Sequence, residues 1–408
     1  MKYIKRALER KFKEMNKVFK AIMVVGARQV GKSTMLEHLA KESNRTIVSM
    51  DDTRARSLAQ KDPSLFFQTY KPPILIDEVQ KAPELFERIK IICDSSERNG
   101  LFWLTGSQSE KLLRQAGDSL AGRICLLKMY SLSQKEIAQI NVADPIDFSF
   151  EALRKRSGKF ATNNIINVFD HIWRGGMPKL LSLSIEQTHE YWNSYIETYL
   201  MRDAVDDNAV TDTEGFRKFL RACAAFSGQL LNYNDIAQVA GISGATAKKW
   251  MKVLQNMGIV YLLEPFYANE LKRLVKTPKL YFCDTGLCAW LSSWTSRQTL
   301  MNGAAAGHYF ETYAIGEIVR EYAYAATTAN LNFYRDANQK EIDLVIEQDG
   351  ILHPVEVKLS SIPDSRSVKT FSLLEKSGKQ IGSGGVICMT ETPFPIDRTN
   401  NLIPANIL

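Results

Sequence analysis

The sequence predicts an α/β protein: a parallel sheet with a phosphate-binding loop and a helical lid, then a winged helix-turn-helix and a small second α/β domain. Three observations lead to this expectation. Residues 21–40 read as a strand, a glycine-rich loop and a helix. Strands and helices alternate through residue 130, which favours a parallel sheet covered on both faces. Asp349-Gly350 lies between two apolar runs, a strong signal for a β-hairpin.

The glycine-rich loop, residues 26–33, reads Gly-Ala-Arg-Gln-Val-Gly-Lys-Ser and fits the pattern GxxxxGK[ST]. Backbone N–H groups of such a loop cradle phosphates, and the N-terminus of the next helix adds partial positive charge. We expect Lys32 to reach the β- and γ-phosphates and Ser33 to place a hydroxyl on Mg²⁺. The alternative is an ordinary glycine-rich turn. The expected ATP-binding residues are Gly26, Ala27, Arg28, Gln29, Val30, Gly31, Lys32, Ser33 and Thr34.

A second apolar strand ends in two carboxylates, Asp77 and Glu78. Asp77 would order the Mg²⁺ shell together with Ser33. Glu78 would act as the base that polarises the attacking water. The signal is weak in isolation, but it becomes strong about forty-five residues after a phosphate loop.

A third strand, residues 101–108, ends in small polar residues. Thr105, Ser107 or Gln108 would sense the γ-phosphate there, or the segment is a capped turn before the next helix. Arg123 follows a helix-ending glycine and opens another strand. It is a candidate finger on the γ-phosphate of a neighbouring subunit, which would imply a homo-oligomer; the alternative is a surface ion pair.

The order of these motifs resembles a prokaryotic AAA-type (AAA+) P-loop ATPase family. They run Gly-x-Arg-x-Val-Gly-Lys-Ser, Leu-Ile-Asp-Glu-Val-Gln, Leu-Thr-Gly-Ser-Gln and Leu-Ala-Gly-Arg. Members of that family carry a C-terminal domain of unknown function related to the PD-(D/E)XK nucleases, and the resemblance extends along the whole chain. It implies a P-loop NTPase core that hydrolyses ATP with Mg²⁺. Ala27 stands where similar proteins often have proline, a change that should leave phosphate binding intact.

The resemblance and the patterns together give four expected domains. They are an AAA-type P-loop ATPase core at 1–130, a helical lid and linker at 131–225, a winged helix-turn-helix at 226–300 and a PD-(D/E)XK nuclease-like domain at 301–408.

Composition indicates the compartment and the kinds of partner to expect for this protein. The chain has 408 residues and no apolar run near ~20 residues, so we expect no membrane partner. Its six cysteines are scattered, which favours reduced thiols in the cytoplasm over a disulfide or zinc framework. The net charge is +7, and residues 1–20 hold eight Lys or Arg against two Glu. This basic segment is either a solvated helix face or a nucleic-acid contact.

Residues 232–241 and 246–257 read as two short helices around a turn, and strands at 259–263 and 280–282 follow. This pattern indicates a helix-turn-helix with a β-wing. DNA is the expected partner, and a protein–protein or interdomain module is the alternative. The candidate DNA contacts are Lys248, Lys249, Lys252, Lys272 and Arg273, with Lys276 and Lys279 in the same basic loop.

The Asp-Gly turn sets the register of the C-terminal hairpin. Gln348 should pair with Ile351, so Asp343 should lie opposite Glu356, about 5 Å away. Two carboxylates that close repel one another unless a divalent metal neutralises them. Pro354 cannot donate to the ladder, so a bulge there would shift the register.

In the same register Glu341 should face Lys358, which would steer or activate a water. The set matches the PD-(D/E)XK pattern, which implies Mg²⁺-dependent hydrolysis of a phosphodiester. The alternative is a salt-bridged sheet face on an inactive nuclease fold. The candidate nuclease site consists of Glu311, Asp343, Glu356 and Lys358.

Three classes of function fit these observations. The first is an ATP-hydrolysing protein that acts on or with DNA. The second is an ATP-gated, Mg²⁺-dependent DNA nuclease. The third is a signalling or defence switch with a protein partner and an inactive nuclease fold.

Overall fold

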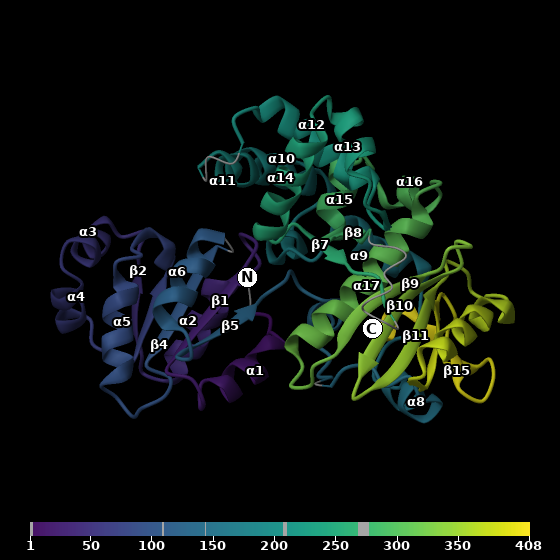
Figure 1. Ribbon diagram of the computed structural model, residues 1–408, viewed down its shortest axis with the longest axis horizontal. Coiled ribbons are helices and arrows are strands. Elements are labelled where there is room, and N and C mark those ends of the chain that lie inside the picture. The colour runs from purple at the N-terminus through teal and green to yellow at the C-terminus, as the bar shows by residue number, and fades with distance from the viewer. Residues whose placement is uncertain (1–2, 108–109, 143, 207–209, 268–276) are drawn as a thin grey trace. The chain divides into compact units, whose positions relative to one another are not determined.

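The computed structural model describes residues 3–107, 110–142, 144–206, 210–267 and 277–408 (Figure 1). Contacts within the chain divide it into two compact units. The first unit contains residues 1–132, 177–179 and 256–258. The second contains residues 133–176, 180–255 and 259–408.

The first unit is built on five parallel strands, β1 (Ala21–Gly26), β2 (Thr46–Ser49), β3 (Ile74–Asp77), β4 (Phe102–Ser107) and β5 (Ile124–Lys128). Their order is β2-β3-β4-β1-β5. Strand β1 is buried along its whole length, as its unbroken apolar run predicts for an inner strand covered on both faces. Because parallel strands end at the same edge, the loops after β1, β3 and β4 meet there. The expected parallel α/β sheet is confirmed.

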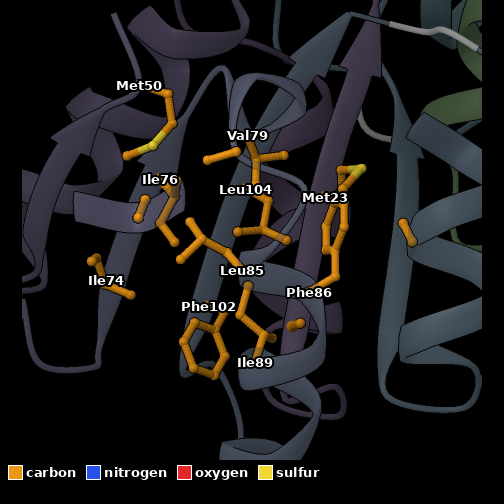
Figure 2. Packing of buried hydrophobic residues seen from close by; sticks show 14 of the residues in the cluster. Met23, Met50, Ile74, Ile76, Val79, Leu85, Phe86, Ile89, Phe102 and Leu104 are labelled. Carbon is orange, nitrogen blue, oxygen red and sulfur yellow. The ribbon is translucent and has the colours of Figure 1, made fainter. Parts of the chain in front are cut away.

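Helices pack against this sheet, and their apolar side chains form a buried core together with those of the strands (Figure 2). Ile74 and Ile76 of β3 lie in one buried cluster with Phe102 and Leu104 of β4 and with Leu85 of the following helix. Burying each such side chain contributes about 1.5–3 kcal/mol, so this core holds β3 beside β4. The helices of the unit are α1 (Leu8–Met15), α2 (Lys32–Glu42), α3 (Thr53–Lys61), α4 (Pro63–Thr69), α5 (Leu85–Asp94), α6 (Glu110–Leu120) and the 3-10 turn η1 (Val79–Lys81).

Helices dominate the first half of the second unit, as expected for residues 131–225. They are α7 (Gln134–Ile137), α8 (Phe150–Ser157), α9 (Ile165–Arg174), α10 (Ile185–Tyr195), α11 (Met201–Asp206) and α12 (Thr213–Ala225), with the short helical segment η3 (Ile196–Leu200). The short turn η2 (Pro178–Ser182) is divided between the two units. Helix α17 (Ala306–Tyr324) ties two of them down through its buried Glu321. This carboxylate pairs with Lys135 of α7 at 2.6 Å and with Arg156 of α8. A lid over the nucleotide remains a prediction for 131–225.

Residues 229–282 contain two helices around a turn, α13 (Tyr233–Ala240) and α14 (Gly244–Asn256). Gly241 ends α13 with φ of 70°, a left-handed conformation that favours glycine. A three-stranded antiparallel sheet of order β6-β8-β7 accompanies them, formed by β6 (Gln229–Leu230), β7 (Val260–Leu263) and β8 (Lys279–Phe282). The candidate contacts Lys272 and Arg273 lie outside the described residues, and so does Lys276.

The remaining helices of the second unit are α15 (Thr285–Leu291) and α16 (Arg297–Met301), with the turns η4 (Ser365–Ser377) and η5 (Ala405–Ile407). The C-terminal sheet has seven strands in the order β14-β15-β13-β11-β10-β9, and β12 pairs with β11. Within the described ranges, no helix combines the length and apolar character needed to span a membrane. The strands are β9 (Asn330–Arg335), β10 (Glu341–Gln348), β11 (Ile351–Val357), β12 (Gln380–Ile381), β13 (Gly384–Cys388), β14 (Phe394–Pro395) and β15 (Asn400–Pro404).

The β10–β11 hairpin has the register that its Asp-Gly turn predicts. Gln348 pairs with Ile351, and Val345 pairs with Pro354 without any shift. The irregularity lies on the other side of β10, where the pairing with β9 shifts between Ile342 and Val345. Pro354 therefore does not disturb the register of the two acidic strands.

Candidate functional site

The phosphate loop connects β1 to α2, and glycine is required at its first position. Gly26 has φ of 152°, and a Cβ atom there would lie 2.1 Å from the carbonyl oxygen of Met129. Gly31, with φ of 99°, immediately precedes the helix. The buried ammonium of Lys32 donates to the loop carbonyls of Gly26 at 3.0 Å and Ala27 at 2.8 Å. The lysine is thus held at the loop that its motif predicts will bind phosphate.

The other loop residues differ in exposure. Gln29 is exposed and has φ of 63°, whereas Arg28 is half-buried and Val30 is buried. Thr34 is exposed on the first turn of α2. The side chains of Gln29 and Thr34 therefore lie at the surface, whereas that of Val30 is enclosed.

Arg6 is a loop-supporting residue that the sequence did not reveal. Its guanidinium is buried and donates to the carbonyls of Val30 at 2.7 Å and Tyr130 at 2.8 Å. The segment was expected to be either solvated or bound to nucleic acid, and for Arg6 both alternatives are wrong. Its contacts lie 24 and 124 residues away, so no local pattern could have identified it.

Asp77 lies at the centre of the site, because strands β3 and β4 end beside α2. Ser33 Oγ donates to Asp77 Oδ1 at 2.5 Å. Thr105 Oγ1 donates to the same oxygen and accepts from the backbone N–H of Glu78 at 3.0 Å. Hydroxyl and carboxylate oxygens are the ligands that Mg²⁺ prefers, so Ser33 and Asp77 fit the expected metal.

Glu78 follows directly, in a conformation that is rare for residues other than glycine. Its φ is 56°, which costs about 1–3 kcal/mol and is typical of residues constrained by function. Gln80 Nε2 donates to Glu78 Oε2, a partner that the motif did not predict. The side chain of Ser107 and all of Gln108 lie outside what the structure describes, so only Thr105 of the three candidate sensors is located.

Arg123 lies just before β5, at the opposite end of the sheet from the phosphate loop. The backbone N–H of Ala21, which starts β1, donates to its carbonyl at 3.1 Å. Its guanidinium forms a surface ion pair with Asp94, with Nε to Oδ1 at 2.5 Å and Nη2 to Oδ2 at 3.1 Å. The position is far from the subunit's own phosphate loop, so a role on phosphate would need a neighbouring subunit.

The three described DNA candidates are exposed on α14. Lys248, Lys249 and Lys252 lie on its solvent side, while Ala247, Trp250 and Met251 face the core. The exposed side of the helix thus carries three lysines, as a phosphate contact would require.

Lys279 was expected in a basic loop, and the structure contradicts this. It lies in β8, is only 3% exposed, and its ammonium faces carboxylates of the C-terminal domain. Its Nζ lies 2.8 Å from Glu311 Oε1 and 3.4 Å from Asp343 Oδ1, and it also pairs with Glu341. All four residues of β8 are buried, and Lys279 lies on the side of the strand that faces these acids.

The rest of the candidate nuclease site surrounds Asp343. Asp343 Oδ2 accepts from the backbone N–H of Val357 at 2.9 Å. Lys358 lies beyond the end of β11, and its Nζ contacts Glu356 at 2.6 Å and Asp343 at 3.8 Å. Glu341, which was expected to face Lys358, forms its ion pairs with Lys279 and, at 2.7 Å, with Arg335 of β9.

Two of these carboxyl groups hold protons unusually tightly. Burial and repulsion by Asp343 raise the pKa of Glu356 to about 8, although Lys358 opposes the shift. The same two causes raise the pKa of Glu311 to about 7, against the attraction of Lys279. The structure thus brings Glu311, Asp343, Glu356 and Lys358 together, but with a buried lysine among them.

Comparison with protein families divides the chain into three segments. Residues 18–138 match the model of an AAA domain. Residues 166–298 and 306–408 match two domains of unknown function, DUF8612 and DUF4143. Uncharacterised proteins of Mycobacterium bovis and Mycobacterium tuberculosis are each 26% identical over 389 residues, which cover 94% of this chain and 80% of theirs.

Solved structures give weaker likenesses. A Walker-type ATPase of Pyrococcus abyssi is 14% identical with a TM-score of 0.43, covering 71% of this chain and 96% of that one. The RuvB Holliday junction branch migration motor of Thermotoga maritima is 16% identical with a TM-score of 0.30, covering 62% and 88%. Neither value is high enough to bear on function. Residues 18–138 thus match an AAA domain, and the geometry around Lys32, Ser33 and Asp77 fits a P-loop ATPase.

Proposed function

We propose that the protein binds ATP with Mg²⁺ at the phosphate loop and hydrolyses it. The observation that carries this proposal is the 2.5 Å hydrogen bond between Ser33 and Asp77. These two residue types hold the Mg²⁺ of P-loop NTPases, and here they come from segments 44 residues apart. Bound Mg²⁺ would neutralise charge that develops on the phosphates.

The residues of the chain divide the remaining work. Lys32 exchanges its two loop carbonyls for β- and γ-phosphate oxygens. Glu78 accepts the proton of the attacking water, while Gln80 orients its carboxylate through the bond to Oε2. Thr105 joins Asp77 to the backbone of Glu78, so a change at the metal side is transmitted to the base.

The test is ATP binding and turnover in three variants. Lys32→Ala should lose both binding and hydrolysis, because its ammonium is the group that the motif places on the β- and γ-phosphates. Glu78→Gln should bind ATP normally and lose about 10²–10⁴-fold in turnover. Lys41→Ala, at an exposed position on the same helix α2, is the matched control and should behave like wild type. Wild-type turnover in Lys32→Ala would refute the assignment.

The ATPase is proposed to act with DNA through α14. The support is the exposed row formed by Lys248, Lys249 and Lys252. Binding of a duplex oligonucleotide would be followed by fluorescence anisotropy across a KCl series. Replacing all three lysines by alanine should reduce the magnitude of the slope of log K against log [KCl] by about 2–3. Each phosphate contact contributes about 0.9 to that slope.

A second triple variant that loses the same charge elsewhere distinguishes direct contact of α14 with DNA from an effect of net charge. Lys155, Lys159 and Lys218 are exposed elsewhere in the same unit, and their triple alanine variant should keep the wild-type slope. Absence of any DNA binding by the wild type, and of any DNA effect on ATP turnover, would remove this proposal.

That outcome would favour the third class, a switch with a protein partner. One observation supports it: the segment after β7 is joined to β9. Phe266 N donates to Phe333 O at 2.6 Å, and Phe333 N donates to Glu264 O at 3.1 Å. The three-stranded sheet therefore serves, at least in part, as a connection to the C-terminal domain.

A homo-oligomer with Arg123 acting in trans is the last part of the proposal. Its support is the position of Arg123 at the far end of the sheet from its own loop. Mixing Lys32→Ala with Arg123→Ala subunits should restore activity that neither has alone, because one interface then contains an intact loop and an intact arginine. Failure of mixed subunits to complement would place the arginine in its surface pair with Asp94 only.

A further inference from the structure

The acidic site of the C-terminal domain already contains a cation. We infer that the ammonium of Lys279 is the resident cation of the carboxylates Glu311, Glu341 and Asp343, in place of the divalent metal that a nuclease-like site would take. This inference concerns the C-terminal domain and does not depend on the ATPase proposal.

The geometry around Lys279 places its charge among the acids. The ammonium lies 2.8 Å from Glu311 of α17 and 3.4 Å from Asp343 of β10, and Glu341 of β10 is a third partner. An ammonium has three N–H donors, which matches three carboxylate partners. The side chain is 4% exposed, so water cannot take over these contacts.

Backbone pairing keeps the lysine in place. Strand β8 is hydrogen-bonded to β6 on one side and to β7 on the other, with Lys279 itself paired to Leu230 and Leu263. Burial alone would lower the pKa of Lys279, but attraction by Glu311, Asp343 and Glu341 outweighs it and raises the pKa. The group therefore stays charged and fixed.

Several of the oxygens that a metal would need are already engaged. Glu311 Oε1 accepts from both Lys279 and the hydroxyl of Tyr281, at 2.6 Å. Asp343 Oδ2 accepts from the N–H of Val357 at 2.9 Å. A divalent ion needs several bare oxygens at about 2.0–2.6 Å, and it would be repelled by the adjoining ammonium. Across the described ranges, no group of three or more His, Cys, Asp or Glu is arranged to hold a metal ion.

The charges of the cluster come close to balance without a metal. Glu311, Glu341, Asp343 and Glu356 face the cations Lys279, Lys358 and Arg335. Glu356 Oε2 is buried without a hydrogen-bond partner. The cluster thus joins β8, α17 and β10 as an ion-paired junction rather than as a metal centre.

The experiment measures Mn²⁺ binding to the full-length protein without nucleotide. All proteins carry Ser33→Ala, which removes the hydroxyl ligand expected at the phosphate loop. Electron paramagnetic resonance counts bound Mn²⁺, and thermal unfolding reports its effect. With Lys279 present, the protein should bind no Mn²⁺ at 1 mM or below, and its Tm should not change.

Adding Lys279→Met gives an unbranched side chain that is one atom shorter and carries no charge. This variant should bind one Mn²⁺ and gain several degrees in Tm with the metal, and a further Asp343→Asn change should abolish both effects. Lys155→Met, at an exposed position of α8, is the matched control and should bind none.

Two results would overturn the inference. One is Mn²⁺ bound to the protein that retains Lys279 and lost on Asp343→Asn, because metal and lysine would then occupy the site together. The other is a folded Lys279→Met variant that binds no Mn²⁺. Where Lys279→Met does not fold, the comparison of Ser33→Ala with Ser33→Ala/Asp343→Asn decides the question. Absence of an Asp343-dependent ion then supports the resident lysine, and its presence refutes it.

Discussion

Asp77 shows how much of the proposed chemistry rests on one side chain. Its Oδ1 accepts hydrogen bonds from Ser33 and from Thr105, and Thr105 also holds the backbone of Glu78. An expected metal ligand, a candidate sensor and a candidate base are thus linked to one carboxylate oxygen through one or two hydrogen bonds. Replacing Asp77 would disturb all three roles together, so Glu78→Gln is the cleaner probe of the chemical step.

At the same scale, Gly26 sets whether the phosphate loop can form. Gly26→Ala places a methyl group 2.1 Å from the Met129 carbonyl in a φ region that L-residues avoid. We expect the free energy of unfolding to fall by about 2–4 kcal/mol and ATP affinity to fall at least tenfold. Urea unfolding and equilibrium ATP binding measure the two effects.

Gly117 provides the control for this substitution. It lies in helix α6, where an added Cβ meets nothing within 4 Å. Gly117→Ala should stabilise the protein slightly, by about 0.5–1 kcal/mol, because alanine favours helix. Wild-type ATP affinity in Gly26→Ala would show that the loop rearranges around the methyl group.

At the scale of elements, the N-terminal segment matters because Arg6 joins two parts of the first unit. It bonds the phosphate loop at Val30 and the end of the sheet at Tyr130. Hydrogen bonds from a charged donor are worth about 1.5–3 kcal/mol each. Arg6→Ala should therefore lower the free energy of unfolding by about 2–4 kcal/mol and weaken ATP binding.

Lys13→Ala is the comparison for Arg6, because Lys13 is an exposed cation of the adjacent helix α1. Its ion pair with Glu42 is a surface contact at 3.4 Å, worth at most about 1 kcal/mol. Denaturant unfolding with nucleotide titration distinguishes the two variants. Equal, small effects of both would mean that Arg6 does not support the loop.

At the scale of the whole molecule, buried charge holds the second unit together. Helix α17 contributes Glu317 and Glu321, which pair with Arg320 and with Lys135 and Arg156. Removing one partner of such a pair leaves an uncompensated charge and commonly costs about 3–5 kcal/mol. The network joins residues more than 160 positions apart, so this unit should unfold cooperatively.

The pH dependence of stability should expose a neighbour of this network, His171. Burial lowers its pKa from 6.5 to about 4, with repulsion by Arg320 adding to the effect. At pH 7 His171 is mostly neutral in both the folded and the unfolded protein, so it has little effect on the free energy of unfolding. As the pH falls from 6.5 towards 4, only the unfolded state gains a proton. The free energy of unfolding then falls by up to about 3 kcal/mol.

Urea unfolding at pH values between 7 and 4 measures this loss as a difference between wild type and His171→Gln. The variant cannot titrate at that position, so its loss should be smaller by the same amount, while other groups cancel. His38→Gln, at an exposed position, should retain the wild-type dependence. If the free energy of unfolding depends on pH in the same way for wild type and His171→Gln, then His171 is not held neutral by burial.

Local patterns predicted much of this molecule and missed its distant pairings. The strand–loop–helix at 21–40 and the Asp349-Gly350 hairpin were predictable because each is determined by neighbours in sequence. The roles of Arg6 and Lys279 were not, since nothing near them distinguishes a buried basic residue from a solvated one. For Lys279 the sequence suggested the wrong surroundings altogether, a basic loop instead of an acidic pocket.

By itself, the sequence determined that this chain contains a phosphate loop, an acidic strand end and a tight C-terminal hairpin. Those features depend on contiguous residues and on their backbone preferences. Only the tertiary structure decided which cation meets the C-terminal acids, because Glu311 and Asp343 lie 32 and 64 residues from Lys279. Charge neutralisation depends on distance in space, and the packing of β8 against α17 and β10 is what brings the lysine there.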